Sequence, residues 1–490
     1  MNDFVKINDK DNVIIVLRNY KAGEKILDFV LLDDVIKGHK VASQDIERGT
    51  NVIKYGYVIG NAIRNIKKGE FVHTHNLKTN LDDKISYLFL KKEYNIINDI
   101  KEVNVNLYKR SEISYGIRNN LFVVPTVGCI NGVVNKNVEI FRNSHTNNSF
   151  YDGIIGINHQ YGCSQLGDDL NITKKLLQNI AKNPNAGGVL ILSLGCENNE
   201  LSEFVKDLDV DSKRLKYLIL QELEDENKTI QEVLNELYEK MSSDTRIETG
   251  ISRVKVGVKC GGSDGFSGIT ANPLIGLFTN YLTSIGGTVI QTEVPEMFGA
   301  ESTLMERAKD LRVFGEITDM INDFKDYYKK HDVVIYENPS PGNKKGGITT
   351  LEEKSLGCVQ KGGVSTIVGC YKMTERVCRS GLNLISAPGN DLISSTVLGA
   401  SGANLILFST GRGTPFGTFV PTLKLSTNHD LFLKKKNWID FDSSRVLVED
   451  KKEVLLSLIK FVQDVCNGKE VLNEINGCCD IGIFKTGVTL

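Results

Sequence analysis

KCGGSDGFSGITANP, residues 259–273, is the stretch that decides the fold of the second half of this chain. Before it, Val254, Val256 and Val258 alternate with other side chains in the pattern of a strand. After it, Asn272 and Pro273 occupy the positions expected for the N-cap and the first residue of a helix. The glycines therefore join a strand to a helix, which is the connection typical of a parallel α/β sheet.

Such a turn is also a place where ligands bind. In open α/β sheets ligands lie outside the carboxyl ends of the strands, and free N–H groups at the start of a helix attract anions. We expect Gly261, Gly262 and Ser263 to bind a carboxylate or a phosphate, and Asp264 in the same turn can move a proton. A tight turn that needs positive φ angles is the alternative explanation for the glycines.

The composition indicates a globular protein with more than one domain. The chain has 490 residues, of which 41% are hydrophobic, and at about 100–200 residues per domain this predicts roughly two to four domains. Its net charge of −2 and its pI of about 6.4 argue against nucleic acids and membranes as partners, so a small solute is expected. Without an apolar leader or a run of about 18 apolar residues, a cytoplasmic protein is expected.

Four segments differ in pattern. Residues 1–82 contain short β-runs broken by glycines, which predicts an all-β module, and the charged residues 83–112 are expected to form a linker. Further on, apolar runs that end in polar turns, including one that opens residues 332–347, alternate with helical patterns, as in an α/β fold. An acidic amphipathic helix within 222–249 separates a middle α/β domain, 113–247, from a C-terminal one, 248–490.

The ten cysteines are too sparse for a disulfide framework and none forms a CxxC pair, so they are expected to be thiols. Cys129, Cys163, Cys196 and Cys260 each stand at the expected carboxyl end of a strand, beside a glycine. If these ends face one crevice, the thiolates can bind a soft metal, either a single iron or an iron–sulfur cluster with one open iron. The alternative is that they are small apolar core residues, as we expect for the remaining cysteines.

Three histidines are candidates for chemistry. His73 and His75 lie two residues apart in an expected strand, so their rings share one face and either hold a divalent metal or form a solvated pair. His159 stands on an expected turn beside Cys163. It is a candidate acid or base, and a histidine that caps this turn is the alternative.

Glycine- and proline-rich loops carry cations. Lys344 and Lys345 lie within residues 338–347, and Arg412 lies within residues 409–417. They are suited to binding a carboxylate, which Arg412 can do with two parallel hydrogen bonds, and a flexible solvated loop is the alternative. The segment EVPEMFGAE adds three carboxylates that are ligands, bases or helix-start charges: Glu293, Glu296 and Glu301.

Several enzyme classes lose support because their motifs are missing. The chain has no GxxxxGK[ST], GxSxG or HExxH motif, and GRGTPFG does not match GxGxxG. This argues against P-loop NTPases, lipase-type hydrolases, zincins and dinucleotide-dependent dehydrogenases. A metal-assisted reaction on a small polar anion remains.

Long motifs follow one another along the chain: PTVGCING, NHQYGCSQLGDD, LGCENN, KCGGSDGFSGITANPLIG, TEVPEMFGAE, YENPSPGNKKGGITTLEEKSLGC and STGRGTPFGTFVPT, after GHKVASQDI, NVIKYG and HTHN near the N-terminus. Together they resemble the altronate and galactarate dehydratase family over the full length. The N-terminal motifs resemble its SAF, or β-clip, module. HTHN and PEMFGAE are more similar to the altronate branch than to the galactarate branch.

The resemblance implies an N-terminal SAF module, a linker, a middle domain that mediates formation of a homodimer, and a C-terminal Rossmann-like domain with a parallel sheet. It also implies dependence on iron, which manganese can replace, and dehydration of altronate to 2-dehydro-3-deoxygluconate. Galactarate dehydration, release of sulfite from sulfolactate and sugar-acid binding without turnover are the alternatives.

The expected site requires iron ligands, a proton carrier and substrate-binding groups in one pocket. Our assignments are Cys163, Cys196 and Cys260 as iron ligands with Cys129 as a fourth, His159 or Asp264 as proton carrier, and the 261–268 turn with Lys344 and Arg412 as substrate-binding groups.

Overall fold

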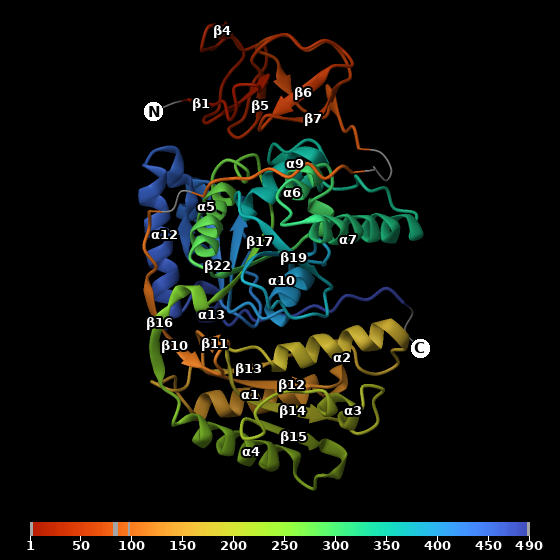
Figure 1. Ribbon diagram of the computed structural model, residues 1–490, viewed down its shortest axis with the longest axis vertical. Helices are drawn as coiled ribbons and strands as arrows, with labels where there is room; N and C mark the ends of the chain where they lie inside the picture. Colours follow the sequence, from red (N-terminus) through yellow and green to blue (C-terminus); the bar gives the residue numbers. More distant parts are fainter. Residues whose placement is uncertain (1–2, 82–86, 97–98, 488–490) are drawn as a thin grey trace.

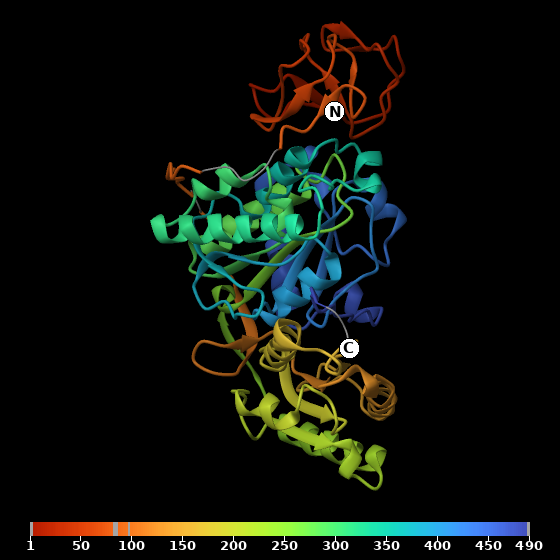
Figure 2. The same cartoon turned by 90° about the vertical axis from the view of Figure 1, so that its right-hand side faces the viewer.

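The computed structural model describes residues 3–81, 87–96 and 99–487. They form an N-terminal, a middle and a C-terminal domain, but the order in space differs from the order in the chain. The C-terminal domain lies between the other two (Figure 1), and the view turned by 90° shows the same stacking (Figure 2). The N-terminal and middle domains therefore pack against opposite ends of the C-terminal domain.

The N-terminal domain has strands and turns but no helix within residues 3–81, which confirms the predicted all-β module. One antiparallel sheet has the order β1 (Phe4–Val5), β2 (Val13–Val16), β5 (Lys40–Ala42), β8 (Phe71–Val72). A second sheet has the order β6 (Asn51–Lys54), β7 (Tyr57–Ala62), β9 (Leu77–Lys78), and β3 (Lys25–Ile26) forms a hairpin with β4 (Phe29–Val30). Its small core includes Ile14, Val16 and Val41.

The expected linker is only partly irregular. Residues 87–96 and 99–103 have no regular secondary structure, but β10 (Asn104–Lys109) is a strand. It lies between β11 (Tyr115–Gly116) and β16 (Arg246–Gly250) in an antiparallel sheet. The remaining linker residues, 82–86 and 97–98, lie outside the described part of the chain. The end of the expected linker therefore belongs to a sheet that joins the two ends of the middle domain.

The middle domain is a parallel sheet with helices on both faces. Its strand order is β13 (Ile154–Gly156), β12 (Asn120–Pro125), β14 (Ala186–Ser193), β15 (Leu215–Ile219). The helices α1 (Asn131–Ser144) and α4 (Glu226–Met241) share a core with one face. The helices α2 (Gly167–Ala181) and α3 (Leu201–Lys206) share a core with the other. Because both faces of β12 are covered, all its residues are buried, and after Asn120 they form a continuous apolar run.

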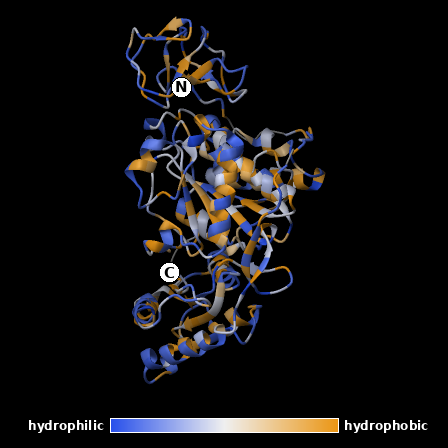
Figure 3. Cartoon of the chain, turned by 90° about the vertical axis from the view of Figure 1, so that its left-hand side faces the viewer, coloured by the Kyte–Doolittle hydropathy of each residue, from blue (hydrophilic) through white to orange (hydrophobic). Residues whose placement is uncertain are grey.

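The C-terminal domain contains a seven-stranded parallel sheet. Its order is β19 (Ile367–Tyr371), β20 (Gly381–Ile385), β18 (Thr288–Gln291), β17 (Lys255–Cys260), β21 (Leu405–Thr410), β22 (Thr422–Ser426), β23 (Phe441–Asp442). Its helices are α5 (Ala271–Ser284), α6 (Glu301–Met305), α7 (Leu311–Lys330), α8 (Pro341–Lys345), α9 (Leu351–Cys358), α10 (Asp391–Ala400), α11 (His429–Lys434), α12 (Lys451–Cys466) and α13 (Leu472–Ile475). The helices α5 and α12 share one core with the sheet and α10 shares another, and Figure 3 shows hydrophobic residues along the central strands.

Two local details differ from the expectations. The helix α5 begins at Ala271 with Thr270 as its N-cap, so Asn272 and Pro273 lie inside its first turn. Residues 332–340 form no strand, and the apolar side chains of Val333, Val334 and Tyr336 are exposed. The edge of the sheet is occupied by β19 instead.

The position of β17 determines where a ligand can bind. The chain passes from β17 to β18 on one side and later enters β21 on the other side. Connections that leave in opposite directions open a crevice at the carboxyl ends of two neighbouring parallel strands. The N-terminal domain lies at this end, where Lys40 Nζ donates to the Gly347 carbonyl at 2.9 Å.

Candidate active site between the N-terminal and C-terminal domains

Residues 261–270 connect β17 to α5 and lie against the N-terminal domain. A Cβ atom on Gly265 would lie 2.0 Å from the carbonyl oxygen of Gly38, and one on Gly261 would lie 2.5 Å from Asp391 Oδ2. Gly262 has a φ of +61°, a conformation that other residues rarely adopt. The glycines therefore form the tight turn of the alternative explanation and also let protein groups approach the turn closely, while anion binding stays a prediction.

The turn offers backbone donors to a ligand. In the described part of the chain, the amides of Gly262 and Ser263 donate to no protein acceptor. The Gly262 carbonyl accepts from the amides of Gly411 and Arg412 at 3.1 Å each, which places the exposed Arg412 beside these donors. Successive amides around a residue with positive φ form an anion-binding concavity, and arginine binds carboxylates with two parallel hydrogen bonds. The arrangement suits a carboxylate.

Asp264 is held by the protein on both carboxylate oxygens. It accepts from Phe266 N at 3.1 Å, Ser267 Oγ at 3.1 Å, Thr427 Oγ1 at 2.9 Å and Asn428 Nδ2 at 3.1 Å. Burial raises the pKa of Asp264, and these hydrogen bonds oppose the shift. The carboxylate joins the glycine turn to the segment after β22. The structure therefore shows Asp264 as a residue that positions the turn, and its role as proton carrier stays a prediction.

The N-terminal domain brings histidines to this junction. His73 Nε2 donates to the Lys344 carbonyl at 3.0 Å, and the centroids of the His39 and His73 rings lie 5.8 Å apart. Burial lowers the pKa of both rings. The centroid of His75 lies 5.6 Å from that of Phe71. Within the described residues, His73 and His75 belong to no group of three metal ligands, so the structure does not support this alternative metal site. Sequence analysis missed His39.

The 338–347 loop meets the glycine turn as expected. Asn343 Nδ2 donates to the Ser263 carbonyl at 2.8 Å, and Arg412 Nη1 lies 3.3 Å from a carbonyl oxygen of α8. Lys344 is therefore near the carboxylate subsite. Lys345 is the exposed last residue of α8, next to Gly346, whose carbonyl accepts from the Gly265 amide of the turn at 2.7 Å.

A buried group of three charges docks the N-terminal domain. Lys40 Nζ and Lys54 Nζ each lie 2.8 Å from a carboxylate oxygen of Glu353, and all three side chains are at most 1% exposed. Burial alone would raise the pKa of Glu353, but the two ammonium groups lower it to about 2. Burial lowers the pKa of Lys40 to about 8, although Glu353 opposes this. Sequence analysis missed this contact, which joins residues 313 positions apart.

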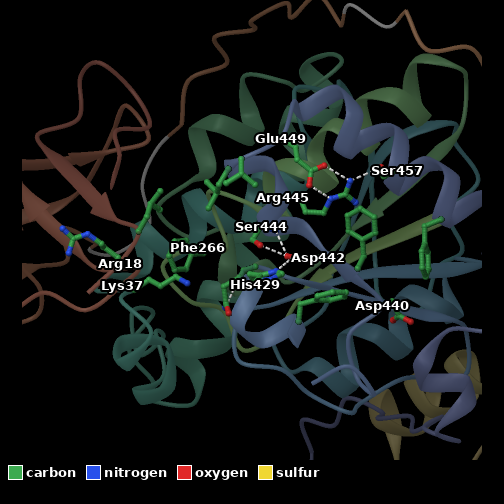
Figure 4. A pocket seen from close by; sticks show the side chains of 18 of the residues that line it. Arg18, Lys37, Phe266, His429, Asp440, Asp442, Ser444, Arg445, Glu449 and Ser457 are labelled. Atoms are coloured by element: carbon green, nitrogen blue, oxygen red, sulfur yellow. Dashed lines mark hydrogen bonds and ion pairs between the residues drawn. The ribbon is translucent and has the colours of Figure 1, made fainter. Parts of the chain in front are cut away.

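A cavity of about 1040 Å³ lies on another side of the turn (Figure 4). Its lining includes Lys37 of the N-terminal domain, Phe266 of the turn and residues that follow β22 and β23. His429, the first residue of α11, lines it with a side chain that is 57% exposed, and His429 Nδ1 lies 2.6 Å from Asp442 Oδ2. Sequence analysis missed this pair. The sequence feature that could have identified His429 is its position directly after Asn428, the N-cap of the helix α11 that follows β22.

The structure separates the predicted iron ligands. Cys129, Cys163 and Cys196 are exposed on loops that follow β12, β13 and β14, whereas Cys260 is buried at the end of β17. The middle domain contacts the opposite end of the C-terminal sheet, where one of its asparagines donates to the Asn404 carbonyl just before β21. Because these strands belong to two different sheets, Cys260 does not share a pocket with the other three, and we correct this assignment.

His159 also lies in the middle domain. Its Nε2 donates to the Pro125 carbonyl at 2.9 Å, and its Nδ1 accepts from the Tyr161 amide at 3.1 Å. Burial lowers its pKa. Both ring nitrogens of His159 therefore form hydrogen bonds to the backbone. This agrees with the alternative interpretation of the sequence, in which the histidine caps its turn. We withdraw its assignment as the proton carrier.

A buried cluster of thiols and charges lies directly behind the glycine turn. Cys260 Sγ lies 3.2 Å from Cys358 Sγ and 3.4 Å from Glu296 Oε2, and Cys358 Sγ lies 3.0 Å from the same oxygen. Among the described residues, these are the one group of three ligands close enough to share an ion. Lys361 Nζ lies 3.0 Å from Cys260 Sγ, and Lys354 Nζ lies 2.8 Å from Glu296 Oε1.

This donor set fits a soft divalent metal. Two thiolates and a carboxylate suit iron or zinc. Tetrahedral metal–sulfur bonds of about 2.3 Å place two sulfur atoms slightly further apart than they are here, so a small outward shift admits the ion. Lys361 can keep its other partner, Glu293, at 2.9 Å. The other candidate carboxylates are engaged in ion pairs, Glu293 also with Lys259 and Glu301 with Lys325.

Comparison with known proteins shows the family. Residues 2–80 match the altronate/galactarate dehydratase SAF domain, residues 107–243 match the D-galactarate dehydratase/altronate hydrolase second domain, and residues 251–489 match the D-galactarate/altronate dehydratase C-terminal domain. The chain belongs to the altronate/galactarate dehydratase family. The resemblance inferred from the motifs is thereby confirmed.

Three members of this family show how far the similarity extends. An altronate dehydratase of Bacillus subtilis (strain 168) is 47% identical over 100% of both chains. An altronate dehydratase of Escherichia coli (strain K12) is 46% identical over 99% of this chain and 100% of the relative. A galactarate dehydratase (L-threo-forming) of the same E. coli strain is 31% identical over 95% of this chain and 93% of the relative. Among the described residues, no helix combines the length and hydrophobicity needed to cross a membrane.

Proposed function

We propose that this protein is a hydro-lyase that converts altronate to 2-dehydro-3-deoxygluconate and water. The observation that carries the proposal is the glycine turn at the switch point of the sheet. Among the described residues, the amides of Gly262 and Ser263 there have no protein acceptor and Arg412 lies beside them, while Phe266 of the same turn lines the large cavity. Full-length similarity to altronate dehydratases supports altronate as the substrate. Galactarate and sulfolactate are the alternative substrates within the family.

The turn matches the chemical requirement of this reaction. Dehydration of an aldonate begins with loss of the proton α to the carboxylate, which creates an enediolate with additional negative charge. The amides of Gly262 and Ser263 and the guanidinium of Arg412 hold the carboxylate and stabilise this charge without reorganising. Asp264 keeps the turn rigid, and we assign the distal hydroxyls to Lys344, which lies beside His73.

Iron(II), with manganese able to substitute, is the cofactor we propose. Cys260, Glu296 and Cys358 would hold it, because their donor atoms lie within 4.8 Å of one another and Cys260 directly precedes the glycine turn. A divalent metal supplies Lewis-acid stabilisation of negative charge. An iron–sulfur cluster with an open iron is the alternative. It would use Cys129, Cys163 and Cys196, which are exposed on neighbouring loops of the middle domain.

The activity is tested with purified protein under anaerobic, reducing conditions with Fe(II). Altronate, galactarate and sulfolactate are supplied separately, and keto-acid formation or sulfite release is measured. Keto acid from altronate supports the proposal, and turnover of only one of the other two acids selects that alternative. Binding of altronate without product identifies a non-catalytic sugar-acid-binding protein.

The carboxylate subsite is tested by Arg412→Ala. Losing a charge-assisted hydrogen bond costs about 1.5–3 kcal/mol, so KM should rise roughly 10- to 150-fold. Lys136→Ala, at an exposed position of α1 in the middle domain, is the control and should keep KM within about twofold. An unchanged KM in Arg412→Ala would place the carboxylate elsewhere.

The metal site is tested by iron content and by ultraviolet–visible and Mössbauer spectra of anaerobically loaded variants. Cys260→Ser and Cys358→Ser should lose iron, and Cys196→Ser should retain it. The reverse pattern supports the cluster in the middle domain. We also propose that the protein forms a homodimer, on the family resemblance alone, which light scattering tests as twice the chain mass of 54.4 kDa.

A further inference from the structure

The wall of the cavity in Figure 4 carries a histidine oriented by a buried carboxylate. His429 Nδ1 lies 2.6 Å from Asp442 Oδ2. Asp442 is 6% exposed, and its Oδ1 accepts from the amide and the hydroxyl of Ser444 at 3.0 and 2.6 Å. Since a carboxylate can only accept, the proton of the neutral imidazole lies on Nδ1. Nε2 therefore has a free lone pair.

This second ring nitrogen is available to a ligand. In the part of the chain that the structure describes, no protein group forms a hydrogen bond with His429 Nε2, and the side chain is 57% exposed where it lines the cavity. Orientation by a carboxylate and access to a ligand are the two geometric conditions for a histidine that moves a proton. His159 meets neither.

His429 is connected to the carboxylate subsite by one short segment. It follows directly on Thr427 and Asn428, whose side chains donate to Asp264 in the glycine turn. Asn428 Nδ2 also donates to the carbonyl of Gly411 at 3.0 Å, the residue before Arg412. The base and the carboxylate subsite therefore belong to one hydrogen-bonded edge, formed by the ends of β17, β21 and β22.

The other charged groups around the cavity are engaged with protein partners. Lys37 Nζ lies 2.8 Å from Asp430 Oδ2, and Arg445 Nη2 lies 2.7 Å from Glu449 Oε2. Arg18 pairs with two acidic residues of the N-terminal domain. Asp440 accepts from two backbone amides at 2.8 and 2.9 Å. Among the described residues that line the cavity, His429 therefore offers a ring nitrogen, Nε2, that accepts no hydrogen bond from the protein and can take a proton.

We propose that His429 takes the α-proton of a bound sugar acid and that Asp442 positions its ring. The proposal deepens the proposed function and rests on it. The C2–H bond breaks as the proton moves to His429 Nε2, and its electron pair forms the enediolate. The C3–O bond then breaks, and the imidazolium returns the proton to the departing hydroxyl, which leaves as water. The enol loses its hydroxyl proton to solvent and gains one at C3, which gives the 2-keto acid.

The first test is His429→Gln in the full-length, Fe(II)-loaded protein with altronate. Positioned general-base catalysis contributes about 10²–10⁴-fold, so kcat should fall by that factor while KM changes only a few-fold. The side chain is more than half exposed, so the fold should be unaffected. His331→Gln is the matched control, because His331 is an exposed histidine at the C-terminus of α7.

A second variant and a second readout separate catalysis from structure. Asp442→Asn keeps the shape of the side chain but can donate to Nδ1, which moves the imidazole proton to Nε2, so kcat should fall with KM retained. We expect the wild type to lose kcat/KM at acid pH, because a protonated base cannot accept the C2 proton, and we expect His429→Gln to lack this loss. In His429→Gln the isotope effect with C2-deuterated altronate should increase.

The outcomes are distinguishable. If His429→Gln turns over within about threefold of the wild type, or keeps the wild-type pH profile and isotope effect, His429 is not the base. If the wild-type protein itself forms no product from any of the three acids, the proposed function fails instead.

Discussion

Replacing Glu353 with glutamine should loosen the N-terminal domain from the C-terminal domain. In the native protein Glu353 neutralises Lys40 and Lys54, both of which are buried. The pKa of Glu353 is lowered from 4.5 to about 2, which at about 1.4 kcal/mol per unit corresponds to roughly 3 kcal/mol. Breaking a buried ion pair costs about 3–5 kcal/mol. The two values agree, so the docking equilibrium should weaken by a factor of roughly 100–1000.

The assay is limited proteolysis of the connecting residues 87–103 combined with denaturant unfolding. In Glu353→Gln, cleavage should be faster and should release the N-terminal domain, and a separate unfolding transition should appear at low denaturant. Glu239→Gln, on the exposed face of α4, is the control that changes the same charge without touching the interface. If Glu353→Gln matches the control within about 0.5 kcal/mol, the buried charges make no net contribution and the reasoning is refuted.

Four further predictions follow, three on the same junction and one on α7. Because the folded pKa of Glu353 lies below its unfolded value, its stabilisation is complete above about pH 4.5 and is lost as the pH falls toward 2, which proteolysis across this range would show. Gly265→Ala should destabilise the junction by about 1–3 kcal/mol in denaturant unfolding, because the new Cβ would lie 2.0 Å from the Gly38 carbonyl oxygen. Gly315→Ala, in open space within α7, should instead stabilise the protein by about 0.5–1 kcal/mol. Asp264→Ala leaves the hydrogen-bond donors around Asp264 unpaired, which should lower the free energy of unfolding by about 1–3 kcal/mol and raise KM. An unchanged KM would show that the turn does not depend on Asp264.

Much of the fold follows from local patterns. Short β-runs with glycine turns predict the N-terminal all-β module, and apolar runs followed by helical patterns predict the parallel sheets. A strand buried on one face alternates apolar and polar residues, whereas a strand buried on both faces is apolar throughout, so each kind can be recognised in the sequence. The glycine turn after β17 is recognisable for the same reason. The strand expected within residues 332–340 does not form: the apolar residues there are exposed, and β19 occupies the edge of the sheet.

The site is less accessible to sequence reasoning. Four cysteines share one local context, a glycine at a strand end, but nothing in that context says which sheet the strand joins. In the structure, Cys260 lies beside Cys358 and Glu296 in the C-terminal domain, whereas Cys129 and Cys163 lie in the middle domain. The same limit conceals the pairing of His429 with Asp442, since each residue alone is unremarkable in the sequence.

By itself, the sequence determined most of the secondary structure, the fold class, the turn that suits a carboxylate and, through its motifs, the family. Only the tertiary structure decided which side chains meet at that turn: the histidines and lysines of the N-terminal domain, Asp264 as a support, and His429 facing the cavity. The physical reason is distance along the chain. Secondary structure depends on neighbours a few residues apart, whereas the site is formed by contacts between segments up to hundreds of residues apart.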